Sequence, residues 1–247
     1  MKFRLLSFLL ILPGFIFAQT DTLFTGLGNL VIHPVYQASM VWEWNGEVIY
    51  VDPSGDPALY KGLPDPTMVL ITENKEEHLD TRILNRLKLG HARLVAPKAV
   101  LKELGALRMR FDEVTELNNG QIMDWKDAST IEAVPVYESR WVDGKLKYVR
   151  TEGNGYLLNL GIKRLYVSGD TEYTPEMSAV RDIDIAFVPV EVPSRVDREK
   201  AAEVVLTLRP KVVYPFQYGG SAPDNMTYFT SLIAQEAPEV EVRVRAR

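Results

Sequence analysis

Short runs of consecutive apolar residues are the feature that most restricts how this chain can fold. They lie at residues 68–72, 93–97 and 182–189. Runs of this length are typical of strands that are buried on both faces, because neither face of such a strand carries many polar side chains. Strands of that kind need a covering layer on each side, so the sequence predicts an α/β protein.

Helices are expected between and after these runs. Glycine stop signals end the first two, and an aspartate N-cap begins the third. The expected ranges are 81–89, 98–104, 197–208 and 228–236.

The remaining strands are rich in β-branched and aromatic residues. The dipeptide Asn45-Gly46 predicts a tight hairpin, because both residues accept positive φ. The order along the chain is β-rich, β/α, β-rich and β/α, which favours a four-layer αββα sandwich of two facing sheets with helices outside. The expected strands are 30–36, 39–44, 47–51, 121–125, 130–137, 156–160 and 164–168, with a polar loop at 138–155.

The N-terminus has the pattern of an export signal. A basic start precedes the apolar run 5–12, and Ala18 is a small residue suited to cleavage. We therefore expect residues 1–18 to be a signal peptide, residues 19–247 to form one domain, and the protein to be periplasmic or secreted. The alternative is an uncleaved membrane anchor. No later apolar run is long enough to cross a bilayer, so we expect no stable membrane insertion after cleavage.

Composition excludes several functional classes. The chain has no cysteine, so it can form neither disulfides nor thiolate metal ligands. Its formal net charge is −5 and it has no basic run, which argues against a nucleic-acid partner. With only three histidines, it cannot build a cluster of several imidazoles around two metal ions.

The stretch TENKEEHLD, residues 72–80, is the most unusual polar segment. It follows the first apolar run and carries three glutamates, a lysine, a histidine and an aspartate. One interpretation is structural, because acidic side chains before the helix at 81–89 would stabilise its N-terminus. The other is a functional site at the end of a buried strand.

Several separate segments, in the same order, resemble the metallo-β-lactamase superfamily, in its lactonase-like branch. They are residues 36–53, 71–80, 153–156, 166–171 and 213–218. The resemblance implies the αββα fold and one or two zinc-type ions, held by a His-x-His-x-Asp-His motif, a later histidine, a bridging aspartate and a late histidine. Such ions lower the pKa of bound water, so that hydroxide can attack an ester, lactone or phosphodiester.

The chain departs from that pattern at most ligand positions. His78 and the bridging Asp170 match it. A protonated lysine has no lone pair and repels a divalent cation, so Lys75 predicts an ion-pair cluster in place of one metal. The resemblance places the other substituted positions at Glu73, Glu77, Glu138 and Gln217.

Three hypotheses about function follow, and whether the protein is an enzyme stays open. The first is a non-catalytic or strongly altered homologue without a metal cofactor, which binds a small or anionic ligand at Lys75. The second is a hydrolase with one Mn²⁺, Mg²⁺ or Zn²⁺ held by Glu77, His78 and Asp170. The third is metal-free acid–base chemistry at Lys75. An ordinary two-zinc hydrolase is not expected.

Overall fold

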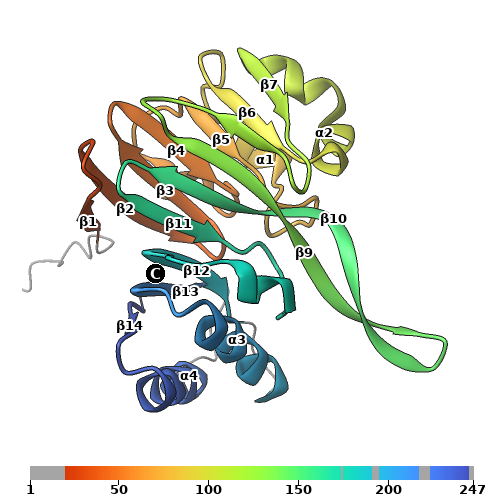
Figure 1. Cartoon of the computed structure of the whole chain (residues 1–247). Coiled ribbons are helices and arrows are strands. Elements are labelled where there is room, and N and C mark those ends of the chain that lie inside the picture. The colour runs from red at the N-terminus through yellow and green to blue at the C-terminus, as the bar shows by residue number, and fades with distance from the viewer. Residues whose placement is uncertain (1–19, 174, 191–194, 217–222, 245–247) are drawn as a thin grey trace, which may run out of the picture.

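The computed structural model describes residues 20–173, 175–190, 195–216 and 223–244. Over these residues the chain forms two sheets that lie face to face, with helices on the outer surfaces (Figure 1). Three buried hydrophobic clusters separate the layers: one between the sheets and one beneath each helical layer. The predicted four-layer αββα sandwich is therefore confirmed. The expected signal peptide, residues 1–18, lies outside the described residues.

The first sheet has seven strands in sequence order, β1 to β7. The strands from β1 to β4 pair antiparallel, and β4 to β7 pair parallel. Asn45 and Gly46 have φ of 49° and 79°, which confirms the expected hairpin turn. The strands are β1 (Asp21–Phe24), β2 (Asn29–Tyr36), β3 (Ser39–Trp44), β4 (Glu47–Val51), β5 (Met68–Leu70), β6 (Arg93–Ala96) and β7 (Glu113–Glu116).

The second sheet also has seven strands, β8 to β14, and follows the same plan. Its early strands pair antiparallel across turns, and the later ones pair parallel, which requires crossover connections. The strands are β8 (Ile122–Asp124), β9 (Thr130–Val142), β10 (Lys145–Leu160), β11 (Lys163–Val167), β12 (Ile185–Pro189), β13 (Val212–Phe216) and β14 (Glu241–Val242).

The helices lie in the expected parts of the chain, but three of their ranges differ from the prediction. The third begins at Arg195, so Asp197 is not its N-cap, and the fourth begins at Pro223 instead of residue 228. The first is only four residues long instead of reaching residue 89, and the Arg110 guanidinium donates to the carbonyls of Leu84 and Leu87, which satisfies that end of the helix. No helix among the described residues is long and apolar enough to span a membrane. The helices are α1 (Thr81–Leu84), α2 (Lys98–Leu104), α3 (Arg195–Leu208) and α4 (Pro223–Glu236), with 3₁₀ turns at Pro57–Tyr60, Gly105–Arg110 and Pro175–Ala179.

Aromatic side chains join the two sheets. The ring centroids of Trp42 and Phe187 are 5.1 Å apart, and those of Phe187 and Tyr214 are 5.2 Å apart. Trp42 and Phe187 are fully buried. Large buried rings contribute strongly to core stability, so this contact fixes how the sheets face each other.

The prediction of a polar loop at 138–155 is wrong. The segment is a long β-hairpin, in which β9 and β10 stay paired out to Val142 and Lys145. Asp143 and Gly144 form its turn with φ of 53° and 72°. Asp-Gly is a strong hairpin signal that the sequence already contained. We call the outer part of this hairpin, residues 140–150, the arm.

Gly161 should tolerate no side chain. It turns between β10 and β11 with φ of +60°, and a Cβ there would collide with the carbonyl oxygen of Thr25. We expect Gly161→Ala to lower the free energy of unfolding by about 3 kcal/mol, measured by urea denaturation.

Gly62→Ala is the matched control. Gly62 also has positive φ, at +89°, but a Cβ there would meet nothing within 4 Å. It should lose only about 1 kcal/mol from backbone strain. Equal losses in the two variants would show that the contact with Thr25 has no role.

Candidate functional site

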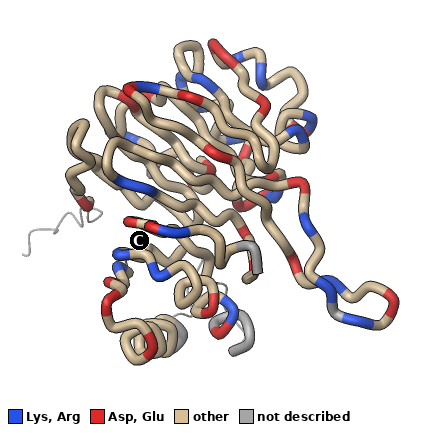
Figure 2. Tube along the Cα trace, in the orientation of Figure 1, with Lys and Arg blue, Asp and Glu red and all other residues tan. Residues whose placement is uncertain are grey.

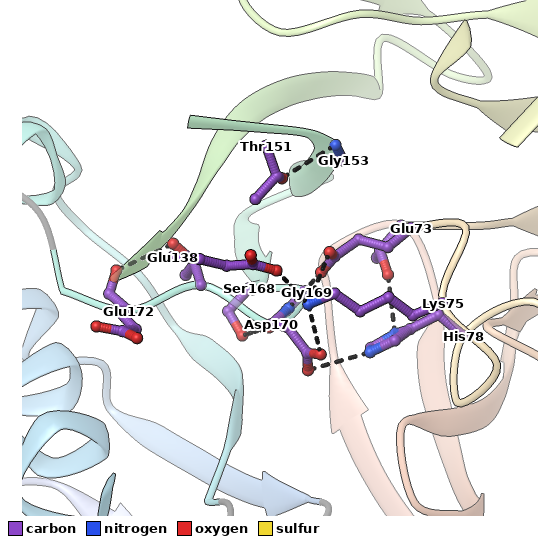
Figure 3. A network of polar contacts seen from close by, with 12 residues as sticks. Glu73, Lys75, His78, Glu138, Thr151, Gly153, Ser168, Gly169, Asp170 and Glu172 are labelled. Carbon is purple, nitrogen blue, oxygen red and sulfur yellow. Dashed lines mark hydrogen bonds and ion pairs between the residues drawn. The ribbon is translucent and has the colours of Figure 1, made fainter. Parts of the chain in front are cut away.

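The residues of the polar segment 72–80 lie beside the loop 168–172 that follows β11 (Figure 3). Strand β10 connects the two. Its Asn154 N–H donates to the Thr72 carbonyl at 2.9 Å, and its Tyr156 hydroxyl donates to the Ile71 carbonyl at 2.8 Å. These buried bonds fix the end of the first sheet against the second, so polar side chains from both sheets converge.

Glu73 is the most deeply buried carboxylate of the group. It is 2% exposed, and its Oε1 accepts a hydrogen bond from the Asp170 backbone N–H at 2.7 Å. Gly153 makes room for it, because a Cβ at that position would overlap the Glu73 side chain. Position 153 therefore requires glycine, because Glu73 approaches the backbone there too closely for any other residue.

Lys75 binds three carboxylates at once. Its Nζ lies 3.2 Å from Glu73 Oε2, 2.7 Å from Glu138 Oε1 and 3.0 Å from Asp170 Oδ2. Burial alone would lower the pKa of Lys75, but the charges of Asp170 and Glu73 and the hydrogen bond with Glu138 raise it above its ordinary value. The amine is therefore a fixed ammonium, and it joins residues from both sheets.

His78 lies between two aspartates. Its Nδ1 is 2.8 Å from Asp52 Oδ2, and its Nε2 is 3.1 Å from Asp170 Oδ1. Asp52 also accepts from the N–H and the hydroxyl of Thr72, at 2.8 and 2.7 Å. Burial would lower the pKa of His78, but the charge of Asp52 and the bonds to both aspartates raise it well above its usual value.

The carboxylates respond differently to this environment. Burial raises the pKa of Glu73, and the nearby charge of Asp170 adds to that effect. Burial would also raise the pKa of Asp170, but the hydrogen bond and charge of His78 and the charge of Lys75 hold it well below its usual range. The hydrogen bond from Lys75 lowers the pKa of Glu138.

The structure brings together five of the seven positions expected from the sequence. They are Glu73, Lys75, His78, Glu138 and Asp170. Gln217 lies outside the described residues.

The prediction that Glu77 is a metal ligand is wrong. The N–H groups of His78 and Leu79 both donate to the Lys75 carbonyl, so the chain turns tightly and leaves Glu77 exposed. Sequence reasoning also missed Asp52, although its place between a strand and a proline marked it as a strand-end residue.

One group of ligand atoms could hold a metal ion. Glu73, His78 and Asp170 each offer one atom, and these atoms lie within 4.8 Å of one another. Asp52 orients the imidazole ring of His78 through Nδ1, as carboxylates do behind metal-binding histidines. This donor set, with Glu73 in place of the expected Glu77, fits one divalent ion once His78 has lost a proton. A second ion does not fit, because the Lys75 ammonium already lies among Glu73, Glu138 and Asp170.

A cavity of about 270 Å³ opens beside this cluster. Lys75 and Asp170 line one side of it. On the other side the Ser139 hydroxyl donates to Glu172, and Lys200 Nζ lies 2.7 Å from the same carboxylate. Both ammonium groups that reach the cavity are thus paired with carboxylates.

A protein-family model described as Beta-lactamase superfamily domain matches residues 32–217 of this chain. The chain belongs to the metallo-β-lactamase superfamily. A UPF0173 protein of Pyrococcus abyssi is 28% identical over 152 residues, which are 61% of this chain and 66% of that protein. A UPF0173 metal-dependent hydrolase of Thermoplasma acidophilum is 26% identical over 161 residues, with 62% and 66% covered. The matched region thus spans just under two thirds of these relatives.

Solved structures agree with this assignment. One from Parabacteroides distasonis, named as a metal-dependent hydrolase, has a TM-score of 0.77 at 28% identity and covers 93% of this chain and 99% of that chain. A metallo hydrolase from Ignicoccus hospitalis has a TM-score of 0.67 at 21% identity, with 87% and 94% covered, and supports the fold alone. These names, together with the Glu73, His78 and Asp170 group, do not support the expectation that no metal is involved.

Lys75→Met should destabilise the protein, because it leaves three neighbouring carboxylates without their shared cation. Removing one partner of a fully buried pair costs about 3–5 kcal/mol, and Lys75 is 35% exposed, so we expect a loss of about 2 kcal/mol. The measurement is urea denaturation at neutral pH with a chelator present. Lys88→Met, which breaks an exposed pair with Asp65, is the control and should change stability by less than about 1 kcal/mol. Equal effects would contradict the special role of Lys75.

The stability gap between the wild type and Lys75→Met should narrow in acid. The pKa values of Asp170 and Glu138 are lowered in the folded state, so the stability they gain from Lys75 is complete above their unfolded values of about 4. It is lost as the pH falls through the folded values. Denaturation curves of both proteins over a series of pH values test this, and a gap that widens in acid would contradict it.

Proposed function

We propose that this chain is a strongly altered member of its family, in which the Lys75 ammonium replaces one metal ion and ordinary two-metal hydrolysis is lost. The observation that carries the proposal is the contact of Lys75 Nζ with Glu73, Glu138 and Asp170 at 2.7 to 3.2 Å. At about 4 Å, two unit charges of the same sign repel by about 4 kcal/mol near a protein surface, and a divalent ion doubles this. The ammonium and a metal therefore compete for the same carboxylates.

The cavity beside the cluster is the proposed ligand site. Its two ammonium groups, on Lys75 and Lys200, already pair with carboxylates. This pairing favours a small neutral polar ligand over the anionic ligand expected from the sequence, because an anion would have to displace an existing carboxylate.

A single-metal hydrolase is the second candidate, and the position of His78 favours it. The Asp52 carboxylate holds Nδ1, so Nε2 faces Asp170, and Glu73 completes the group. A bound divalent ion would lower the pKa of a water molecule for attack on an ester, lactone or phosphodiester. In that case Asp52 would orient the imidazole of His78, and Lys75 would neutralise the negative charge that a single metal ion does not balance.

Metal stoichiometry tests the leading proposal. We expect the purified wild type to hold at most one Mn²⁺ or Zn²⁺ per chain by elemental analysis. A variant that combines Glu73→His, Lys75→His, Glu138→His and Gln217→His should hold two, because it restores imidazole ligands and removes the competing ammonium. Two ions per wild-type chain would refute the replacement.

A melting-temperature titration separates the two candidates. If one ion binds at Glu73, His78 and Asp170, an excess of Mn²⁺ or Zn²⁺ at a hundred times the dissociation constant should stabilise the fold by about 2.7 kcal/mol. His78→Ala should abolish this gain, whereas His91→Ala, at an exposed position, should keep it. If neither metal stabilises the wild type, the single-metal hydrolase is excluded and the altered homologue without a metal is the remaining candidate.

We also propose that the protein is exported, on the basis of the signal-like residues 1–18. Expression in a Gram-negative host should give a periplasmic product whose N-terminal sequence begins at Gln19. Full-length protein that stays in the cytoplasm would contradict this proposal.

A further inference from the structure

The arm is the part of the described chain that extends furthest from the two sheets (Figure 1). Its strands pair with each other from Tyr137–Arg150 outward to Val142–Lys145. Its root is held by Ser139, whose N–H and hydroxyl both donate to Glu172. The hairpin is therefore fixed at its base, while its outer residues project from the body.

The arm exposes two large aromatic side chains on one face. Ser139 and Trp141 are two residues apart on β9, and Tyr148 pairs directly with Ser139, so all three point to the same side. Trp141 is 75% exposed and Tyr148 is 49% exposed. Tryptophan and tyrosine are enriched among the residues that contribute most of the binding energy at the centres of protein–protein contacts.

The arm is also basic, in contrast to the rest of the chain. It carries Arg140, Lys145, Lys147 and Arg150 against the single acid Asp143, a formal charge of +3 (Figure 2). The whole chain carries −5, so the residues outside the arm carry −8. A basic arm on an acidic body is complementary to another body of the same kind.

The body has a hollow of the opposite character. It has a volume of about 660 Å³, and its charged lining residues are four acids and one base, Arg82, which pairs with one of the acids. The acids are Asp56, Glu76, Glu77 and Asp80. Leu59, which is 45% exposed, adds an apolar surface to it. The buried Ser54 hydroxyl also lines it and has no hydrogen-bond partner among the described residues. We call this feature the acidic hollow.

We propose that the arm of one molecule docks into the acidic hollow of a second copy of this chain. The basic side chains of the arm meet the carboxylates of the hollow, and Trp141 packs against its apolar wall. Two such contacts related by a twofold axis close the assembly, because each molecule offers one arm and one hollow.

The test is the oligomeric state of the full chain, measured by sedimentation velocity over a series of concentrations. We expect the wild type to dimerise. Lys145→Glu with Lys147→Glu, or Glu76→Lys with Glu77→Lys, should each raise the dimer dissociation constant at least about tenfold, because each pair of changes reverses the charge of one partner surface. An equal mixture of the two variants should form a mixed dimer, because both of its contacts pair opposite charges: the unchanged arm meets the unchanged hollow, and the reversed arm meets the reversed hollow.

The matched control is Lys98→Glu with Lys102→Glu, which makes the same charge change at exposed positions on α2. It should leave the dimer unchanged, and melting temperatures check that every variant is folded. A wild type that stays monomeric throughout the series would overturn the proposal, and so would a mixture of the reversed variants that does not associate. Binding of a monomeric wild type to phosphatidylserine vesicles, lost in the arm variant, would assign the arm to an anionic membrane instead.

Discussion

The contact on which the site depends is that of one ammonium with three carboxylates. Lys75 follows β5 of the first sheet, whereas Glu138 lies on β9 and Asp170 follows β11 of the second. The cation therefore ties the two sheets together at the edge where the fold brings acidic side chains within a few ångströms of one another. Without a charge of this sign, burial of Glu73 beside Asp170 would be strongly unfavourable.

His78 completes this balance from the other side. It shares Asp170 with Lys75 and is itself held by Asp52 and Thr72. The result is a chain of alternating charges, Asp52, His78, Asp170 and Lys75, in a partly buried edge of the sandwich. Such a network is consistent with a fold that keeps its geometry when an ammonium group, instead of a metal ion, neutralises its carboxylates.

The sequence predicted the layers of the fold and five of the positions that meet at the site, because apolar runs and the family resemblance both constrain them. It did not predict the hairpin of β9 and β10, whose polar side chains hid a regular alternation and an Asp143-Gly144 turn. Glu77 was misplaced because a tight turn after Lys75, which spacing along the chain does not reveal, directs it to solvent. Asp52 was missed because its role depends on a partner 26 residues away.

Glu138 has two roles that the fold makes inseparable. It lies at the root of the arm, next to Ser139, and one of its oxygens touches the Lys75 ammonium while the other pairs with Arg140. Because Glu138 and Arg140 lie on the same strand, this carboxylate joins the root of the arm directly to the Lys75 ammonium. A displacement of the arm relative to the body would therefore have to lengthen the contact between Glu138 and Lys75 or carry the Lys75 ammonium with it.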